Sequence, residues 1–347
     1  MSANVGENAS PFVDQLADGP GVSRIDPTDP AAPMYRLLAL MRSPVALRDL
    51  MLQPVRTGYI GQEKPIDPAE LPKGAAELYS RHPRVRAGCS IAIGPHSLSG
   101  IQSAGRSCAT GDDAVRARRR IHARAVGGHR YITSRIAAEN GMVVVSVNYR
   151  LAPEWPFPAC LDDCIVVLQW MQRNGSTVGG DGARITVGGD SAGGNIAAAL
   201  PLKARDAGLP VPQAAVLLAP ITDFFFEQYE SFEQLAPLGI VYDTAFIGFI
   251  RGAYLVHGRN WGHPHASPTR ADLHGYPATF IATGTADPLV DDNRAFAEKL
   301  RAAGGAEVEH LVRDGMPHGF YFFPGMFKQG DQAFAAIAAF LKRTGLA

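Results

Sequence analysis

The feature that most constrains the fold is a regular alternation, from residue 129 onward, between short apolar runs and longer amphipathic segments. The apolar runs have the length and composition of buried strands, and they lie at 142–148, 184–189, 214–220, 278–284 and 307–314. The segments between and after them have helical periodicity, and they lie at about 130–140, 160–174, 192–206, 291–304 and 329–344. This alternation predicts an α/β fold with a mostly parallel sheet and helices on both of its faces.

Two segments depart from the alternation. Residues 221–275 contain the aromatic runs FFFEQYESF and FIGFIRGAY and are too long for an ordinary connection between two strands. Residues 28–60 contain PMYRLLALMRSPVALRDLMLQ, which reads as one or two helices. We predict that both belong to a helical cap. The chain then divides into N-terminal cap helices at 1–60 and a catalytic domain at 61–347, with a cap insertion at about 221–275.

The charges of the chain are balanced, with 33 Lys and Arg against 33 Asp and Glu. No net field therefore attracts nucleic acid or an anionic membrane, and neither is predicted as a partner. No run approaches the roughly 18 apolar residues that a membrane span needs. The N-terminal MSANVGENASPFVDQLADGP lacks the pattern of a secretory signal, so a cytoplasmic protein is predicted.

The four cysteines indicate neither a metal site nor a redox site. Cys89, Cys108, Cys160 and Cys164 match no spacing typical of zinc ligands or of a redox pair. Cys160 and Cys164 fall one helical turn apart in an apolar helix, where reduced thiols behave as small hydrophobic groups. We predict buried free thiols, no metal and no cofactor.

The strongest chemical signal is GGDSAGGN at 188–195, which lies directly between a predicted strand and a predicted helix. It contains Gly-x-Ser-x-Gly in the strand–turn–helix context of a nucleophilic serine. Gly189 and Gly193 lack a Cβ, so the strand and the helix can approach closely around a strained turn that exposes Ser191. The backbone N–H of Ala192 then lies at the positive end of the helix and is a candidate oxyanion donor.

A nucleophilic serine needs a histidine base and a carboxylate that orients the base, and the chain has both after the serine. Asp287 follows a predicted strand in TADPLVDD, and His318 follows the next predicted strand in DGMPHGF. Catalytic loops collect at the carboxyl edge of such a sheet. Asp291 and Asp292 are rival acids, but they open the next helix, where carboxylates are usual as caps or dipole partners.

Taken together, these motifs resemble the hormone-sensitive-lipase-like family of α/β-hydrolases. The resemblance covers roughly residues 129–345, with a weaker likeness in the N-terminal cap. The segments that carry it are GGDSAGGN, NYRLAPEWPFPACLDD (148–163), HASP (265–268), TADPLVDD and DGMPHGF.

The resemblance implies an α/β-hydrolase fold and a serine carboxylesterase that acts on short- to medium-chain acyl esters without a cofactor. Its substrate would be a small-molecule ester. Ser191 would be the nucleophile, His318 the general base and then acid, and Asp287 the residue that orients His318. Asp190 and Asn195 belong to the same motif as Ser191 and would support its loop. Members of this family are often dimers, which leaves a homodimer open.

One family feature is missing. The family carries His-Gly-Gly-Gly before the strand that here is 142–148, and its glycine amides supply oxyanion donors. At the corresponding place this chain has RARRRIHARAVGGHRY at 116–131. The preceding CATGDDAVRA would have to be the central strand, yet Asp112 and Asp113 would then be buried charges, which are very costly. Gly127 and Gly128 are the substitute donors that the written sequence offers.

A compensated frameshift explains this anomaly. If Ala117–His122 is encoded GCA CGG CGG CGG ATT CAT, reading one base later gives CAC GGC GGC GGA TTC, which is His-Gly-Gly-Gly-Phe. The same shift permits an apolar strand just upstream. The shifted segment would begin near 87–107 and end near 125–128.

Two alternatives remain open at this stage. The arginine run could be a solvated loop of an intact esterase, with Gly127 and Gly128 as donors. The chain could instead be a catalytically impaired hydrolase fold, as a receptor, a scaffold or a broken gene product, because loss of one oxyanion donor lowers the rate roughly 10²–10³-fold. The plant gibberellin receptors, which resemble this family, lack the catalytic histidine, whereas His318 is present here.

Sequencing of the source DNA across codons 80–135 tests the frameshift directly. We expect the corrected frame to read through His-Gly-Gly-Gly at the place of the arginine run. Confirmation of the arginine codons in the original frame would contradict the hypothesis.

Overall fold

The computed structural model describes residues 88–95, 130–238, 244–256, 258–304, 306–323 and 327–347. These residues form a sheet with the strand order β2-β1-β3-β4-β5-β6. Strands β3, β4, β5 and β6 run parallel to one another. The strands are β1 (Gly88–Pro95), β2 (Val143–Asn148), β3 (Gly180–Asp190), β4 (Ala214–Leu218), β5 (Ala278–Ala286) and β6 (Val308–Pro317). The prediction of a mostly parallel α/β fold is confirmed.

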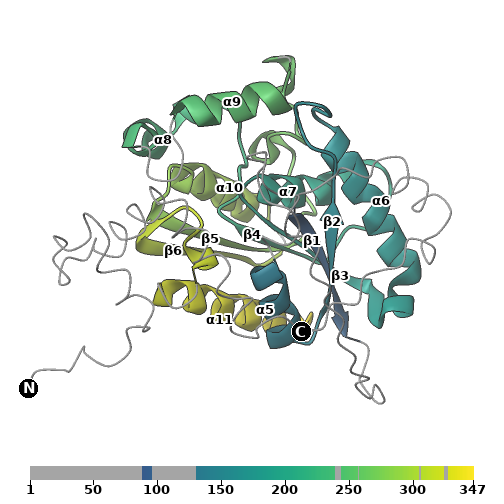
Figure 1. Cartoon of the computed structure of the whole chain (residues 1–347). Helices are drawn as coiled ribbons and strands as arrows, with labels where there is room; N and C mark the ends of the chain where they lie inside the picture. The colour runs from purple at the N-terminus through teal and green to yellow at the C-terminus, as the bar shows by residue number, and fades with distance from the viewer. Residues whose placement is uncertain (1–87, 96–129, 239–243, 257, 305, 324–326) are drawn as a thin grey trace, which may run out of the picture.

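Helices cover both faces of this sheet, as Figure 1 shows. Helices α5 and α11 lie on one face, and α6, α7 and α10 lie on the other. Each of the five helices predicted from periodicity is present with its ends within two residues of the expected positions. Their bounds are α5 (Arg130–Asn140), α6 (Ala159–Asn174), α7 (Ser191–Asp206), α10 (Val290–Ala303) and α11 (Lys328–Arg343).

The alternation of side chains along β5 divides the core into two layers. Phe280 is fully buried in the cluster that contains Phe340 of α11, whereas the next residue, Ile281, is fully buried in the cluster that contains Phe296 of α10. Successive side chains of a strand point to opposite faces, so a strand buried on both faces must be apolar throughout. Burial of each large side chain stabilises the fold by about 1.5–3 kcal/mol.

Strand β1 is the exception to the parallel arrangement. It lies between β2 and β3 and is antiparallel to both, with Cys89 opposite Val147 on one side and Gly189 on the other. The sequence patterns did not predict a strand at 88–95. A strand is needed at this place because the facing edges of β2 and β3 carry backbone groups that require partners. The segment CATGDDAVRA, which we rejected as the central strand, lies outside the described residues, as do Gly127 and Gly128.

The predicted cap insertion at 221–275 packs around a cluster of aromatic side chains, which also includes Leu289. It contains α8 (Glu230–Leu235) and α9 (Thr244–Tyr254), which lie beyond the layer of α7 and α10 in Figure 1. Phe224, Phe226 and Phe232 are buried together, and the rings of Phe226 and Phe232 stack with centroids 5.3 Å apart. Packing therefore explains the first aromatic run of the insertion, whereas Phe246 and Phe249 of the second run are exposed. The predicted cap helices at 1–60 lie outside the described residues.

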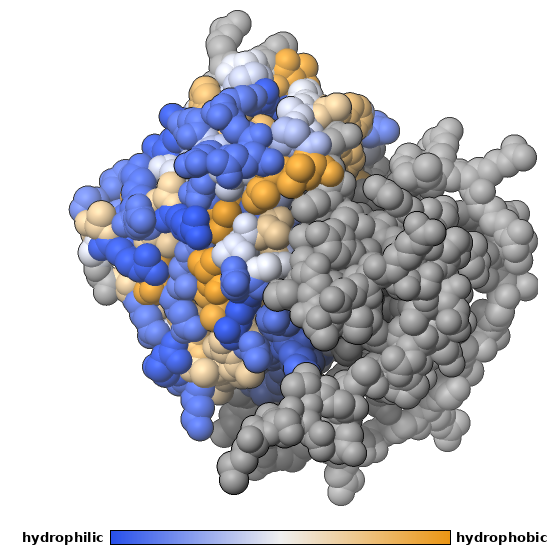
Figure 2. Space-filling view, turned by 90° about the vertical axis from the view of Figure 1, so that its left-hand side faces the viewer, coloured by the Kyte–Doolittle hydropathy of each residue, from blue (hydrophilic) through white to orange (hydrophobic). Residues whose placement is uncertain are grey.

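In the face that Figure 2 shows, the described surface is largely hydrophilic, and a narrow band of apolar residues crosses it. The large apolar side chains that stand exposed are Leu238, Phe246, Phe249 and Val256. Among the described residues, none of the helices is both long enough and apolar enough to cross a membrane. Cys160 and Cys164 are buried and reduced, as predicted, whereas Cys108 lies outside the described residues.

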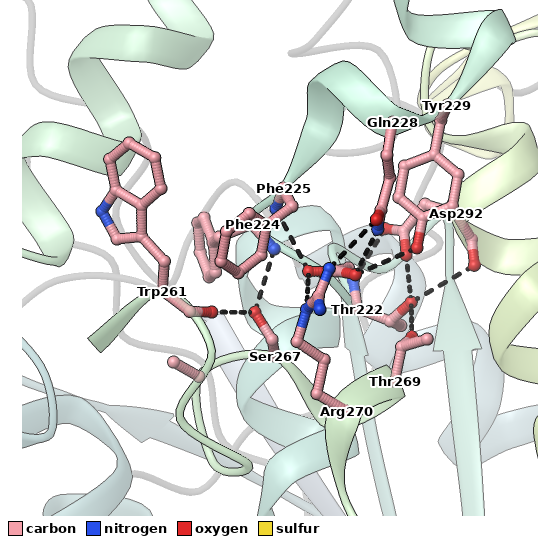
Figure 3. Close-up of polar contacts among 12 residues, drawn as sticks. Thr222, Phe224, Phe225, Gln228, Tyr229, Trp261, Ser267, Thr269, Arg270 and Asp292 are labelled. Carbon is pink, nitrogen blue, oxygen red and sulfur yellow. Dashed lines mark hydrogen bonds and ion pairs between the residues drawn. The ribbon is translucent and has the colours of Figure 1, made fainter. Parts of the chain in front are cut away.

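A buried polar network attaches the start of the insertion to α10 (Figure 3). Asp292, in the first turn of α10, is only 1% exposed. One of its carboxylate oxygens accepts a hydrogen bond from the backbone N–H of Thr222 at 2.8 Å, and the other accepts one from the Thr222 hydroxyl. The Thr269 hydroxyl donates to the Thr222 hydroxyl at 2.9 Å. Thr222 therefore joins α10 to the end of the insertion.

The adjacent Asp223 carboxylate fixes the other side of this network. It accepts hydrogen bonds from Arg270 at 3.0 Å, from Gln228 at 2.6 Å and from the Tyr229 hydroxyl at 3.1 Å. Asp223 is only 1% exposed, and its charge is paired with the Arg270 guanidinium. Among the described residues, no Lys, Arg or His side chain forms an ion pair with Asp292. Burial, with a smaller contribution from the negative charge of Asp223, raises the pKa of the Asp292 carboxyl from 3.8 to about 8.

The raised pKa predicts how stability depends on pH. Folding favours the protonated form of Asp292, so its contribution to stability is complete below pH 3.8 and is lost as the pH rises through about 8. The substitution Asp292→Asn is neutral at every pH and removes this dependence. We expect the free energy of unfolding of the wild type, measured in urea, to fall relative to that of Asp292→Asn between pH 5 and 8. A constant difference over this range would contradict the raised pKa.

Candidate active site

The candidate nucleophile, Ser191, lies where β3 passes directly into α7. Strand β3 ends at Asp190, and α7 begins at the next residue, Ser191. Ser191 has a φ of 53°, in the left-handed region that residues other than glycine rarely adopt. A Cβ added at Gly189 would lie 2.2 Å from the carbonyl oxygen of Gly193, so a side chain there would force the strand and the helix apart. The expected strand–turn–helix geometry is therefore present at this motif.

A further glycine, Gly194, is required by the same close packing and was not singled out from the sequence. A Cβ at Gly194 would lie 2.8 Å from the Cα of Pro220, which follows β4. The signal for it was present, because GGDSAGGN contains two glycines more than the Gly-x-Ser-x-Gly pattern needs, and Gly194 is one of them. Gly194 allows the chain after β4 to pass directly against α7.

The candidate acid and base are in direct contact. His318 Nδ1 lies 2.8 Å from Asp287 Oδ2, and the two side chains are 7% and 0% exposed. Asp287 directly follows β5 and His318 directly follows β6, and Ala286 of β5 pairs with Pro317 of β6. The carboxyl ends of parallel strands meet at one edge of the sheet, which brings residues 31 positions apart together.

The Asp287 carboxylate is held from its own loop as well. Its Oδ1 accepts a hydrogen bond from the backbone N–H of Leu289 at 2.9 Å, while Oδ2 faces the imidazole. Leu289 is the residue that precedes α10. The start of α10 and the orientation of His318 are thus linked through one carboxylate.

The rival acids, Asp291 and Asp292, lie in the first turn of α10, as expected for partners of its helix dipole, but neither caps the helix. Leu289, rather than either carboxylate, occupies the position before α10, and it makes no side-chain cap. Asp291 accepts a hydrogen bond from the backbone N–H of Ser231 at 2.9 Å and binds Arg294 at 2.7 Å. Both residues lie in the first turn of α10 but bind the insertion: Asp291 holds α8, and Asp292 holds Thr222.

Asn195 makes two contacts that hold the nucleophile turn. Its side-chain amide donates to the carbonyl of Ile221 at 2.8 Å and to the carbonyl of Ala266 at 2.7 Å. Ala266 lies in HASP, one of the segments that carry the family resemblance. The Ile221 N–H in turn donates to the carbonyl of Ser191 at 3.3 Å. Asn195 therefore joins α7 to two segments that come after it in the chain.

Of the candidate oxyanion donors, only Ala192 lies among the described residues. Ala192 is the second residue of α7, and first-turn N–H groups of a helix have no partner within the helix. Asp190, with extended backbone, is the residue before α7. Gly127 and Gly128 lie outside the described residues and remain predictions. Within the described ranges, no group of three or more His, Cys, Asp or Glu side chains is placed to hold a metal ion.

Known proteins resemble this chain in both sequence and structure. A carboxylesterase of Mycobacterium tuberculosis, NlhH, is 40% identical over 206 residues, which cover 58% of this chain and 63% of that protein. The match thus spans less than two thirds of the length of this relative. The hyperthermophilic esterase from the archaeon Pyrobaculum calidifontis has a TM-score of 0.60 at 32% identity, covering 64% of this chain and 73% of that one.

A solved esterase from the bacterial hormone-sensitive lipase family has a TM-score of 0.57 at 36% identity, covering 63% of this chain and 72% of that one. A family that is described as the alpha/beta hydrolase fold matches residues 123–322, and the match begins within the arginine-rich segment at 116–131. Because this match covers more than half of the chain, the protein belongs to the α/β-hydrolase fold family and resembles its hormone-sensitive-lipase-like members.

Proposed function

We propose that this protein is a serine carboxylesterase that hydrolyses short- to medium-chain acyl esters through an acyl-serine intermediate. The names of its relatives, carboxylesterase and esterase, support this function. They also favour an active enzyme over an impaired hydrolase-fold receptor or scaffold.

The observation that carries the proposal is the buried bond between Asp287 Oδ2 and His318 Nδ1, 2.8 Å long. A carboxylate at Nδ1 fixes the tautomer in which Nε2 can accept a proton, and it stabilises the imidazolium that forms. Ser191 stands on the same edge of the sheet, at the carboxyl end of β3. Its left-handed backbone is the conformation of a serine nucleophile raised above the sheet.

The reaction follows from these positions. The Ser191 hydroxyl oxygen attacks the ester carbonyl carbon while His318 Nε2 takes the hydroxyl proton. The tetrahedral intermediate collapses, the leaving alcohol receives the proton from His318, and the acyl group stays on Ser191. Water then attacks the acyl group, with His318 again as base, and releases the carboxylic acid. The Ala192 N–H, at the positive end of α7, would stabilise the oxyanion in both steps.

The substrate class is inferred from the family and from the cap. We infer a preference for small apolar acyl groups, because the cap insertion is aromatic-rich. Phe224, Phe226 and Phe232 are buried in the core of the insertion, so an acyl pocket would be lined by other residues. We expect the predicted N-terminal cap helices, which lie outside the described residues, to contribute to this pocket.

The proposal also covers the substrate, the partners, the cofactor and the location of the enzyme. We propose a small-molecule ester as its substrate, no nucleic acid as a partner, and no cofactor. A cytoplasmic location and a homodimer are expectations from the sequence and from the resemblance.

A burst experiment with a short-chain p-nitrophenyl ester tests the proposed function. We expect a burst of p-nitrophenol equal to the enzyme concentration, because acylation of Ser191 by an activated ester releases the alcohol faster than deacylation regenerates the enzyme. In Ser191→Ala the burst should vanish and kcat should fall roughly 10⁴–10⁶-fold, as when a triad residue is removed. An undiminished burst in Ser191→Ala would overturn the assignment of the nucleophile.

A further inference from the structure

The segment after β4 touches the element of the candidate nucleophile and the element of the candidate acid at the same time. We define the β4 loop as residues 219–222, which follow the last residue of β4. Leu218 of β4 pairs with Asp190 of β3, so Ala219 and Ser191 leave the sheet side by side. They are the two non-glycine residues with positive φ in the described part of the chain, at 44° and 53°.

On one side, the β4 loop holds the serine turn. The Ile221 N–H donates to the Ser191 carbonyl at 3.3 Å, and the Ile221 carbonyl accepts from the Asn195 amide at 2.8 Å. Pro220 packs so closely on Gly194 that a Cβ there would lie 2.8 Å from the Pro220 Cα. A shift of this loop would therefore move the backbone that carries Ser191.

On the other side, the β4 loop is held by two neighbouring residues of α10. The Asn293 amide donates to the Pro220 carbonyl at 2.7 Å. Asp292 accepts from both the N–H and the hydroxyl of Thr222. Asn293 also accepts from Thr283 of β5 at 2.7 Å, which fixes the start of α10 to the sheet. The loop is thus tied to the helix that follows Asp287.

These bonds form a continuous path between the catalytic groups. From Ser191 the path runs through Ile221 and Thr222 to Asp292, then along the first turn of α10 to Leu289. Leu289 donates to the Asp287 carboxylate, whose other oxygen faces His318.

We propose that Asp292 and Thr222 are positioning residues of the esterase: through the β4 loop they set the place of Ser191 relative to the Asp287–His318 pair. This inference rests on the proposed function. Neither residue needs to touch the substrate, because each acts through Ile221 on the Ser191 backbone. A misplacement of about 1 Å lowers the rate of a chemical step by about 10²-fold even when its cause lies far from the reacting atoms.

The test compares variants of the full chain with p-nitrophenyl butyrate. Asp292→Ala removes both carboxylate acceptors of Thr222 and leaves only the main-chain carbonyl of residue 292, 3.4 Å from the Thr222 hydroxyl. Asp292→Asn keeps an acceptor for the Thr222 N–H and offers an amide to its hydroxyl. It is therefore the conservative variant, which should restore most of the activity that Asp292→Ala loses. Thr222→Val is a milder change that removes only the hydroxyl. Asp291→Ala is the matched control, because Asp291 lies in the same turn and accepts a backbone N–H from α8 rather than from the β4 loop.

The readout is kcat per active site, with active sites titrated by a fluorophosphonate. A merely structural role would lower the number of titrated sites and leave kcat per site unchanged. We expect kcat per site to fall about 10- to 100-fold in Asp292→Ala with little change in KM. The Asn and Val variants should lose less, and Asp291→Ala should behave as the wild type.

The outcomes separate the inference from the proposed function. If the wild type hydrolyses the ester and loses activity in Ser191→Ala, but Asp292→Ala keeps its kcat per site, the positioning role is overturned and the esterase stands. If Asp292→Ala does not fold, an unchanged kcat per site in Thr222→Val overturns the role in the same way. If the wild type itself neither hydrolyses esters nor reacts with the fluorophosphonate, the proposed function fails, and the inference falls with it.

Discussion

A left-handed backbone at Ser191 joins β3 directly to α7, and the surrounding elements are arranged to permit this turn. Such a conformation is strained for a residue with a Cβ and persists only where its surroundings enforce it. Gly189 and Gly194 allow backbone to approach on two sides, and Ile221 binds the serine carbonyl. The turn is therefore stabilised by close packing of backbone, which tolerates few substitutions.

The candidate acid and base depend on a different kind of constraint, which is the register of two parallel strands. Asp287 and His318 come together because β5 and β6 end at the same level, and their bond is shielded from water. Strand register relates this pair to Ser191 only indirectly, through β4, which lies between β3 and β5. The β4 loop adds a second connection, because it forms hydrogen bonds with Asn195 on the serine side and with Asp292 and Asn293 of α10 on the other side.

Periodicity predicted the elements from residue 130 onward because each is apolar on the faces that it buries. The position of Asp287 and His318 after strands was enough to propose them as a pair. The partnership of Thr222 with Asp292 could not be predicted, because they are 70 residues apart and a buried polar pair leaves no periodic signal. Strand β1 was missed because its sequence, GCSIAIGP, is rich in small residues and lacks the run of large apolar residues that is typical of a buried strand.

Covalent trapping tests whether Ser191 is the nucleophile of an intact catalytic site. The purified full chain would be treated with a fluorophosphonate, digested, and mapped by peptide mass spectrometry. We expect one phosphonyl adduct per chain, on Ser191, and none in His318→Ala, because the serine needs its base to react. An adduct on another residue, or an unmodified chain, would show that Ser191 is not the nucleophile.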